Sequence, residues 1–170
     1  MKKLFTPLLA ALGMLAVYSL PVFADDDTVI YLVRHAEKLA DKDPGLTELG
    51  IARAEALANR LESAGITQVF STDYKRTRMT AAPTAKKSGV TVTLYDPRAL
   101  KLFAEQLADL AKAVSGNILV VGHSNTTPVV ASFLTNTEYP MLNEDQYDHL
   151  YIVRQASDGS LTATIEYFNP

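Results

Sequence analysis

Two short apolar runs, each followed by a histidine, most constrain what this chain can fold into. Residues 29–33 (VIYLV) lead directly into Arg34 and His35, and residues 117–122 (NILVVG) lead into His123 in the same way. Runs of this length, rich in β-branched residues, predict strands that are covered on both faces, as in an α/β sheet. Open α/β sheets bind ligands beyond the carboxyl ends of their strands, so both histidines are candidate site residues.

Helix and strand patterns alternate along the rest of the chain. We expect helices over residues 48–63, from about 74 to 88, over 98–114 and over 126–134, and strands over 67–71, 90–95, 150–153 and 161–168. The last two strands should form a hairpin across residues 157–160 (SDGS). Right-handed crossovers arrange such units as a three-layer α/β/α sandwich with a mostly parallel sheet and a C-terminal antiparallel hairpin.

Three local signals refine the helix boundaries. Thr47 is a good N-cap for the helix that begins at Glu48. Residues 71–73 (STD) are expected to cap the next helix. Pro83 falls late in that helix and is expected to bend it or to end it early, because proline lacks the backbone N–H that a helix needs.

The first 24 residues have the pattern of a secretory signal peptide. Lys2 and Lys3 precede an apolar stretch that runs to Phe23, and residues 22–24 (VFA) form a small-residue cleavage site. An uncleaved membrane anchor is the alternative, but the break at Pro21 and the acidic residues 25–27 (DDD) favour cleavage. We therefore expect a signal peptide at 1–24, a single domain at 25–170, a periplasmic or secreted protein, and no stable membrane insertion after cleavage.

Composition narrows the choice of partners. The chain has 16 Lys and Arg against 19 Asp and Glu, without a basic run, so no nucleic-acid partner is expected. It contains no cysteine, no His-x-x-x-His pair and no dense carboxylate cluster, so neither a metal nor another cofactor is expected. The oligomeric state is left open.

The side chains beyond the strand ends suggest phosphate chemistry. Arg34, His35, Asp96 and His123 would meet at the carboxyl edge of the sheet, and Arg76 lies near the start of a helix that follows another strand. Two converging arginines bind a tetrahedral oxyanion such as phosphate. Arginine charge disfavours a protonated imidazole, so one histidine can attack phosphorus and form a phosphohistidine that water hydrolyses. The other histidine can donate to the phosphoryl oxygens.

These residues resemble the signatures of the histidine phosphatase superfamily, which has the phosphoglycerate mutase-like fold. Residues 34–37 (RHAE) are similar to its Arg-His-Gly motif, and the resemblance continues through residues 46–50 (LTELG), 71–76 (STDYKR) with Thr80-Ala81, and 120–124 (VVGHS). The resemblance implies that His35 is the phosphorylated nucleophile and that Arg34, Arg76 and His123 complete the phosphate pocket. Arg76 is assigned rather than Arg78 because the family's arginine precedes its Thr-Ala pair by four residues.

The chain departs from the family pattern in two places. Ala36 replaces the usual glycine, a small change. The long segment that holds the family's general acid is absent, and Asp96 stands at that place in the fold. Asp96 can protonate a leaving oxygen or can simply end a strand beside Pro97, and the sequence leaves both roles open. Without that lid the site should be open and shallow, as in small phosphohistidine phosphatases, which favours hydrolysis over mutase transfer.

The sequence therefore predicts an exported, metal-independent phosphatase that hydrolyses a small phosphorylated substrate, a phosphomonoester, through a phosphohistidine on His35. Two alternatives stay open. One is a phosphohistidine-protein phosphatase, and the other is a non-catalytic module that has kept the phosphate-binding pocket without turnover. Glu37 and Lys38 either face the substrate or are solvated loop charges.

Overall fold

The computed structural model describes residues 28–170, so the expected signal peptide at 1–24 lies outside the described residues. Six strands form one sheet in the order β3-β2-β4-β1-β5-β6. The parallel strands are β1 (Ile30–Arg34), β2 (Ile66–Ser71), β3 (Val92–Leu94) and β4 (Asn117–Gly122), and the antiparallel hairpin is β5 (His149–Gln155) with β6 (Leu161–Tyr167). β5 joins the hairpin to β1 by antiparallel pairing. From residue 28 onward, no helix combines the length and apolar character needed to cross a membrane.

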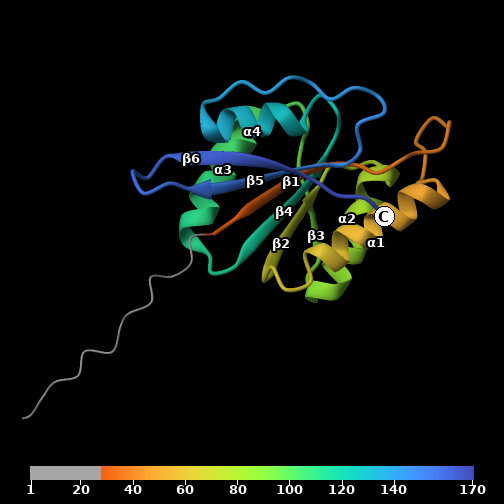
Figure 1. The fold of residues 1–170 in the computed structure, drawn as a ribbon, viewed down its shortest axis with the longest axis horizontal. Helices are drawn as coiled ribbons and strands as arrows, with labels where there is room; N and C mark the ends of the chain where they lie inside the picture. The colour runs from red at the N-terminus through yellow and green to blue at the C-terminus, as the bar shows by residue number, and fades with distance from the viewer. Residues whose placement is uncertain (1–27) are drawn as a thin grey trace, which may run out of the picture.

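The helices lie on both faces of the sheet (Figure 1). α1 (Glu48–Arg60) and α2 (Lys75–Ser88) cover one face, and α3 (Leu100–Ala113) and α4 (Thr127–Thr135) cover the other. This arrangement confirms the predicted three-layer α/β/α sandwich with its C-terminal antiparallel hairpin. The parallel strands and their crossover helices place four strand ends at one edge of the sheet.

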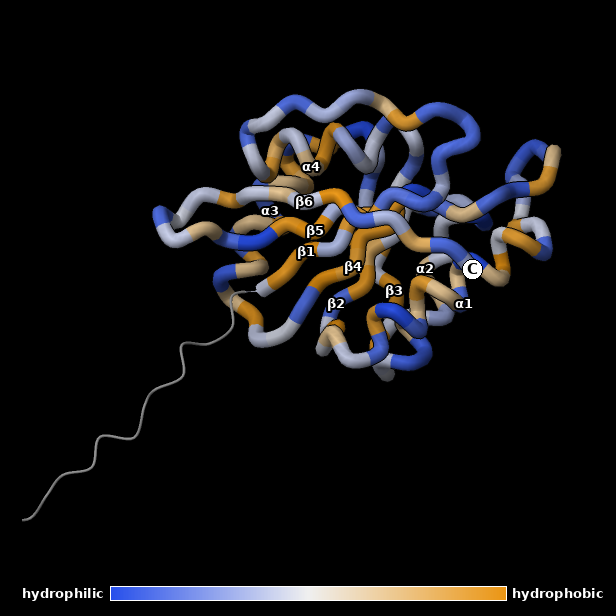
Figure 2. The backbone as a smooth tube through the Cα atoms, viewed as in Figure 1, coloured by the Kyte–Doolittle hydropathy of each residue, from blue (hydrophilic) through white to orange (hydrophobic). Residues whose placement is uncertain are grey.

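The central strand β1 is buried on both faces, as its unbroken apolar sequence predicts. Ile30 and Leu32 pack into the core under α3 and α4, whereas Tyr31 and Val33 pack into the core under α1 and α2. Hydrophobic residues accordingly concentrate along the central strands, and polar residues concentrate in the surrounding loops (Figure 2). Because the side-chain period of a strand is two residues, one continuous apolar run supplies both cores.

α1 begins as predicted, with Thr47 as its N-cap: the Thr47 hydroxyl accepts a hydrogen bond from the backbone N–H of Gly50 at 3.1 Å. The helix ends at Arg60, three residues before the predicted boundary. This start brings Gly50 against the chain that leaves β1. A Cβ at Gly50 would lie 2.2 Å from the carbonyl oxygen of Glu37, so only glycine allows this close approach.

α2 (Lys75–Ser88) matches the predicted range, but the expected cap from residues 71–73 and an early end at Pro83 are both wrong. Tyr74 is the N-cap residue and makes no side-chain capping bond, whereas the backbone N–H of Lys75 donates to Asp43 at 3.1 Å. The hydroxyl groups expected to cap this helix are engaged elsewhere, as described below. α2 also continues through Pro83 to Ser88, because the buried residues Ala81, Thr84 and Ala85 anchor the turns on both sides of the proline.

Candidate active site

The two histidines meet because they follow neighbouring parallel strands in register. Arg34 at the end of β1 lies opposite Gly122 at the end of β4, and the backbone N–H of His35 donates to the Gly122 carbonyl at 2.9 Å. The next residues, His35 and His123, place their ring centroids 5.5 Å apart at an interplanar angle of 70°. The structure therefore brings both rings to one edge of the sheet.

Gly122 is needed for the tight passage from β4 to His123. A Cβ at this position would lie 2.8 Å from the Thr126 hydroxyl oxygen and 2.9 Å from the hydroxyl oxygens of Thr127 and Tyr95. The Thr126 hydroxyl in turn accepts a hydrogen bond from the backbone N–H of His123 at 2.8 Å. The hydroxyl groups that hold the start of α4 against β4 thus occupy the space of a side chain at residue 122.

The imidazole ring of His35 is neutral, and its contacts define which ring nitrogen carries the proton. Its Nδ1 lies 2.8 Å from the carbonyl oxygen of Ala36, which can only accept, so the proton is on Nδ1 and the lone pair is on Nε2. Burial is the main cause that lowers the pKa of His35 to about 3; the hydrogen bond to Ala36, the next largest effect, raises the pKa, and the charges of Arg34, His123 and Arg76 lower it. The sequence suggested arginine charge alone as the reason for a neutral ring, but burial contributes more to the lowered pKa of His35.

Arg76 and His123 form the second half of the site. The Nη2 of Arg76, in the first turn of α2, lies 3.3 Å from the Nδ1 of His123, and its guanidinium carbon lies 4.4 Å from the centroid of the Tyr74 ring. Burial, followed by the charges of Arg76 and Arg34, lowers the pKa of His123 to about 4. The buried Nε of Arg76 and that of Arg34 have no hydrogen-bond partner in the structure.

Arg34 has a structural role that the sequence did not predict. Its Nη1 donates to the carbonyl oxygens of Asn143 (2.7 Å), Glu144 (3.2 Å) and Gln146 (3.2 Å), and its guanidinium carbon lies 4.1 Å from the centroid of the Tyr147 ring. The Glu144 carboxylate lies 3.4 Å from Nη2. Arg34 therefore fixes the loop between α4 and β5 beside the histidines, over more than 100 residues of sequence separation. No periodic pattern in that loop signals the contact.

Asp96 is not brought into this group. Its exposed carboxylate accepts hydrogen bonds from the backbone N–H and the guanidinium of Arg98, each at 2.9 Å, and these bonds lower the pKa of Asp96. It is also absent from the cavity that the histidines line. A carboxylate whose ionised form is stabilised and which does not line the cavity is poorly suited to protonate a leaving group.

The other charged candidates are also resolved. Glu37 forms an ion pair with Arg53 at 2.7 Å. The sequence did not predict this contact, although it contains an acidic residue at 37 and a basic residue at 53. Arg53 also donates to the carbonyl of Phe168 at 2.9 Å, which ties the C-terminal segment to α1. Lys38 does line the cavity. Arg78 pairs with Asp73 on the surface, consistent with the choice of Arg76.

The histidines and arginines line a cavity of about 440 Å³. Its lining is Arg34, His35, Lys38, Tyr74, Arg76, Pro97, Arg98, His123, Ser124, Asn125, Thr126 and Glu144. Glu144 is the one carboxylate among these residues, so the cavity is strongly cationic and suits an anionic ligand. Within residues 28–170, no group of three or more His, Cys, Asp or Glu side chains is placed to hold a metal ion.

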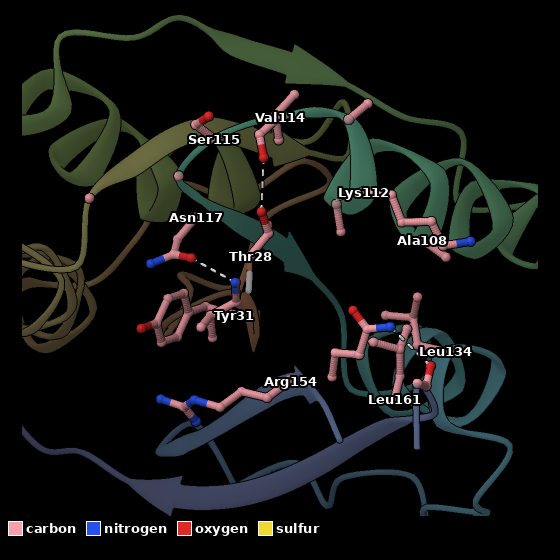
Figure 3. A pocket seen from close by; sticks show the side chains of 17 residues that line it. Thr28, Tyr31, Ala108, Lys112, Val114, Ser115, Asn117, Leu134, Arg154 and Leu161 are labelled. Carbon is pink, nitrogen blue, oxygen red and sulfur yellow. Dashed lines mark hydrogen bonds between the residues drawn. The ribbon is translucent and has the colours of Figure 1, made fainter. Parts of the chain in front are cut away.

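A second, larger cavity of about 1230 Å³ lies at the opposite ends of the parallel strands (Figure 3). Tyr31, Lys112 and Arg154 line it together with apolar residues and the loop before β4, and no histidine or carboxylate among residues 28–170 takes part. It offers no group that can act as a nucleophile or a general base near neutral pH. The chemistry therefore belongs to the smaller cavity.

Comparison with known proteins identifies the sequence pattern. The pattern of the histidine phosphatase superfamily (branch 1) matches residues 30–99. A relative from Yersinia pestis (strain Pestoides F), named probable phosphoglycerate mutase GpmB, is 40% identical over 81 residues. The match covers 43% of this chain and 37% of the relative, so the chain matches little more than a third of that protein's length.

Solved structures share the fold over nearly their whole length. The protein histidine phosphatase SixA complexed with tungstate superposes with a TM-score of 0.70 at 16% identity, covering 82% of this chain and 97% of that chain. A mycobacterial glucosyl-3-phosphoglycerate phosphatase complexed with VO3 superposes with a TM-score of 0.63 at 15% identity, covering 84% and 99%. Identities this low establish a common fold and leave the reaction to be argued from the site.

Proposed function

We propose that this chain is a member of the histidine phosphatase superfamily, whose pattern matches residues 30–99, and that it is a metal-independent phosphatase that hydrolyses a phosphomonoester through a phosphohistidine on His35. The observation that carries the proposal is the His35 ring itself. It is buried and neutral, its proton is committed to the Ala36 carbonyl, and its free Nε2 belongs to a ring that lines a cationic cavity. A ring in this state is a nucleophile without any further activation.

In the first step, the Nε2 lone pair of His35 attacks phosphorus, a P–N bond forms, and the bond from phosphorus to the leaving oxygen breaks. The leaving oxygen keeps the electron pair and takes a proton from water. Arg34 and Arg76 stabilise the phosphoryl charge. In the second step, water attacks phosphorus and the P–N electron pair returns to Nε2.

The phosphohistidine-protein phosphatase remains a second candidate, and the position of Asp96 favours it. With Asp96 turned toward Arg98, the cavity holds no protonated acid for a poor leaving group. A phosphohistidine substrate that is protonated on its second ring nitrogen releases its imidazole as a neutral ring, so in that form it needs no acid from the enzyme. The similarity in fold between this chain and the protein histidine phosphatase SixA is compatible with this candidate.

Turnover of p-nitrophenyl phosphate, an alkyl phosphate and a phosphohistidine peptide, measured in the presence of a chelator, tests the proposal. The activated ester is expected to turn over, and His35→Ala is expected to abolish both turnover and acid-labile phosphorylation of the protein. Labelling that persists in His35→Ala would place the nucleophile elsewhere. Binding of phosphate without turnover of any substrate would indicate the non-catalytic module.

The same substrates decide the role of Asp96. Asp96→Asn is expected to leave the turnover of both esters unchanged, because its carboxylate does not line the cavity. A selective loss on the alkyl phosphate would assign Asp96 as the general acid after all.

We also propose that the protein is exported to the periplasm or beyond, on the basis of the signal peptide pattern in residues 1–24. N-terminal sequencing of protein recovered from the periplasm and the medium tests this. A mature chain that begins at Asp25 supports cleavage, and a full-length chain retained in the cytoplasm refutes it.

A further inference from the structure

We propose that Thr72 is a positioning residue that fixes the proton of His123 on Nε2 and so keeps Nδ1 unprotonated and able to accept a proton during catalysis. This inference rests on the proposed function for its catalytic consequence. Thr72 follows β2 directly and is fully buried. Its hydroxyl oxygen lies 2.9 Å from the Nε2 of His123 and 3.0 Å from the hydroxyl oxygen of Thr77.

The direction of the Thr72 hydrogen bonds follows from the partners of Thr77. The Thr77 hydroxyl lies 2.9 Å from the carbonyl oxygens of Thr72 and Tyr74, and both of these can only accept, so the single proton of Thr77 is used there. The Thr77 oxygen must then accept the proton of Thr72. Thr72 is left with lone pairs toward His123, and the Nε2 of His123 must be the donor.

The other side of the ring imposes the same assignment independently. Arg76 Nη2 lies 3.3 Å from the Nδ1 of His123, and a guanidinium can only donate. Nδ1 must therefore accept, which again leaves the proton of a neutral ring on Nε2. Two contacts from different elements, the residue after β2 and the first turn of α2, thus agree on one tautomer.

The two site histidines consequently hold their protons on opposite nitrogens. His35 has its proton on Nδ1 and His123 has its proton on Nε2. A neutral His123 in this form presents a lone pair, not a proton, on the side of Arg76. The sequence-based expectation that His123 donates to phosphate therefore requires that Nδ1 first gains a proton.

The hydrolysis of phospho-His35 supplies that proton. The water oxygen forms a bond to phosphorus, and the P–N bond breaks with its electron pair remaining on the Nε2 of His35. One proton of the water moves to the Nδ1 of His123, whose lone pair becomes available when the Nη2 of Arg76 turns from it to the phosphoryl oxygens. Thr72 takes no part in bond making, but without its acceptor oxygen only the contact with Arg76 still favours an unprotonated Nδ1 on His123.

Histidine 15N NMR reads the tautomers directly, and the chain has only three histidines to assign. The resting wild-type protein is expected to show the proton of His35 on Nδ1 and that of His123 on Nε2. Thr72→Val keeps the shape of the side chain but removes the acceptor and leaves Arg76 alone to favour the Nε2–H form, so part of the His123 signal should shift toward the Nδ1–H form. Thr72→Ser should restore the wild-type spectrum.

Turnover is measured on the same variants, with Thr84→Val as the matched control. Thr84 is buried in α2 and its hydroxyl has no hydrogen-bond partner, so the same chemical change there should leave both the spectrum and the rate unaltered. Thr72→Val is expected to lower kcat by roughly 10²-fold, the size of a proton-transfer contribution, with KM little changed and with rescue by Thr72→Ser.

Two results would overturn the inference. One is a wild-type spectrum with the proton of His123 on Nδ1, which needs no variant and no turnover. The other is a Thr72→Val rate that falls no further than that of Thr84→Val. A wild-type protein that lacks turnover but shows the expected tautomers would instead refute the proposed function and leave the Thr72 contact in place.

Discussion

A shift from pH 8 to pH 5 is expected to destabilise the folded protein because it holds two buried histidines neutral. The pKa of an unfolded histidine is 6.5, whereas the folded protein lowers that of His35 to about 3 and that of His123 to about 4. At pH values between the folded and the unfolded pKa of each ring, the unfolded chain binds more protons than the native protein. The free energy of unfolding is therefore at its full value above pH 6.5 and falls as the pH falls through this window.

The size of the loss follows from the same linkage. At pH 5 the unfolded imidazoles are almost fully protonated and the folded ones are not, so each ring lowers the free energy of unfolding by about 2 kcal/mol relative to pH 8, or about 4 kcal/mol for the pair. This value depends little on the exact folded pKa, because both folded values lie at least one unit below pH 5.

Urea unfolding at pH 8 and pH 5, followed by far-UV circular dichroism because the chain has no tryptophan, measures this loss. His35→Gln replaces the ring with a neutral group that does not titrate, and its loss should be smaller than that of the wild type by about 2 kcal/mol. Carboxylates titrate in both proteins, so the comparison isolates the ring. Equal losses in the two proteins would refute the claim that His35 is held neutral by burial.

Three further substitutions test individual contacts of the site. Gly122→Ala places a Cβ within 2.9 Å of three hydroxyl oxygens and is expected to cost roughly 1–3 kcal/mol, measured by urea unfolding. Arg53→Met leaves the Glu37 carboxylate largely buried without its partner and is expected to cost about 3–5 kcal/mol in the same assay. Glu144→Gln removes the carboxylate beside Arg34 and is expected to tighten the binding of inorganic phosphate by up to about fivefold, because an exposed pair contributes about 1 kcal/mol or less. Isothermal titration measures the last effect, and unchanged or weaker binding would show that Glu144 does not compete for Arg34.

The sequence predicts those parts of the site that depend on strand order. An apolar run that ends in Arg34-His35 and another that ends in His123 identify two buried strands, and parallel strands carry their last residues to the same edge. The strong periodic patterns of the helices supply the crossovers. The fold and the meeting of the two histidines both follow from these local signals.

The remaining parts depend on contacts between distant segments, which no local pattern encodes. Arg34 donates a hydrogen bond to the carbonyl oxygen of Asn143, which lies 109 residues further along the sequence, and Arg53 donates to that of Phe168, 115 residues further along. Asp96 has the position of an acid in sequence order but turns toward Arg98, only two residues away. Pro83 stays within α2 because tertiary burial outweighs its local tendency to end a helix.

The positions of the imidazole protons of His35 and His123 depend on the arrangement of the sheet as well as on the histidines themselves. The proton of His35 is placed by its own neighbour in the chain, the carbonyl of Ala36, whereas that of His123 is placed by Thr72 at the end of another strand. Only the order β2-β4-β1, with β4 between the other two, lets His123 contact Thr72 on one side and His35 on the other. The edge strand β6 pairs with β5 alone, whereas β5 pairs with β1, so the hairpin supports the site through β1 and through the loop that Arg34 holds.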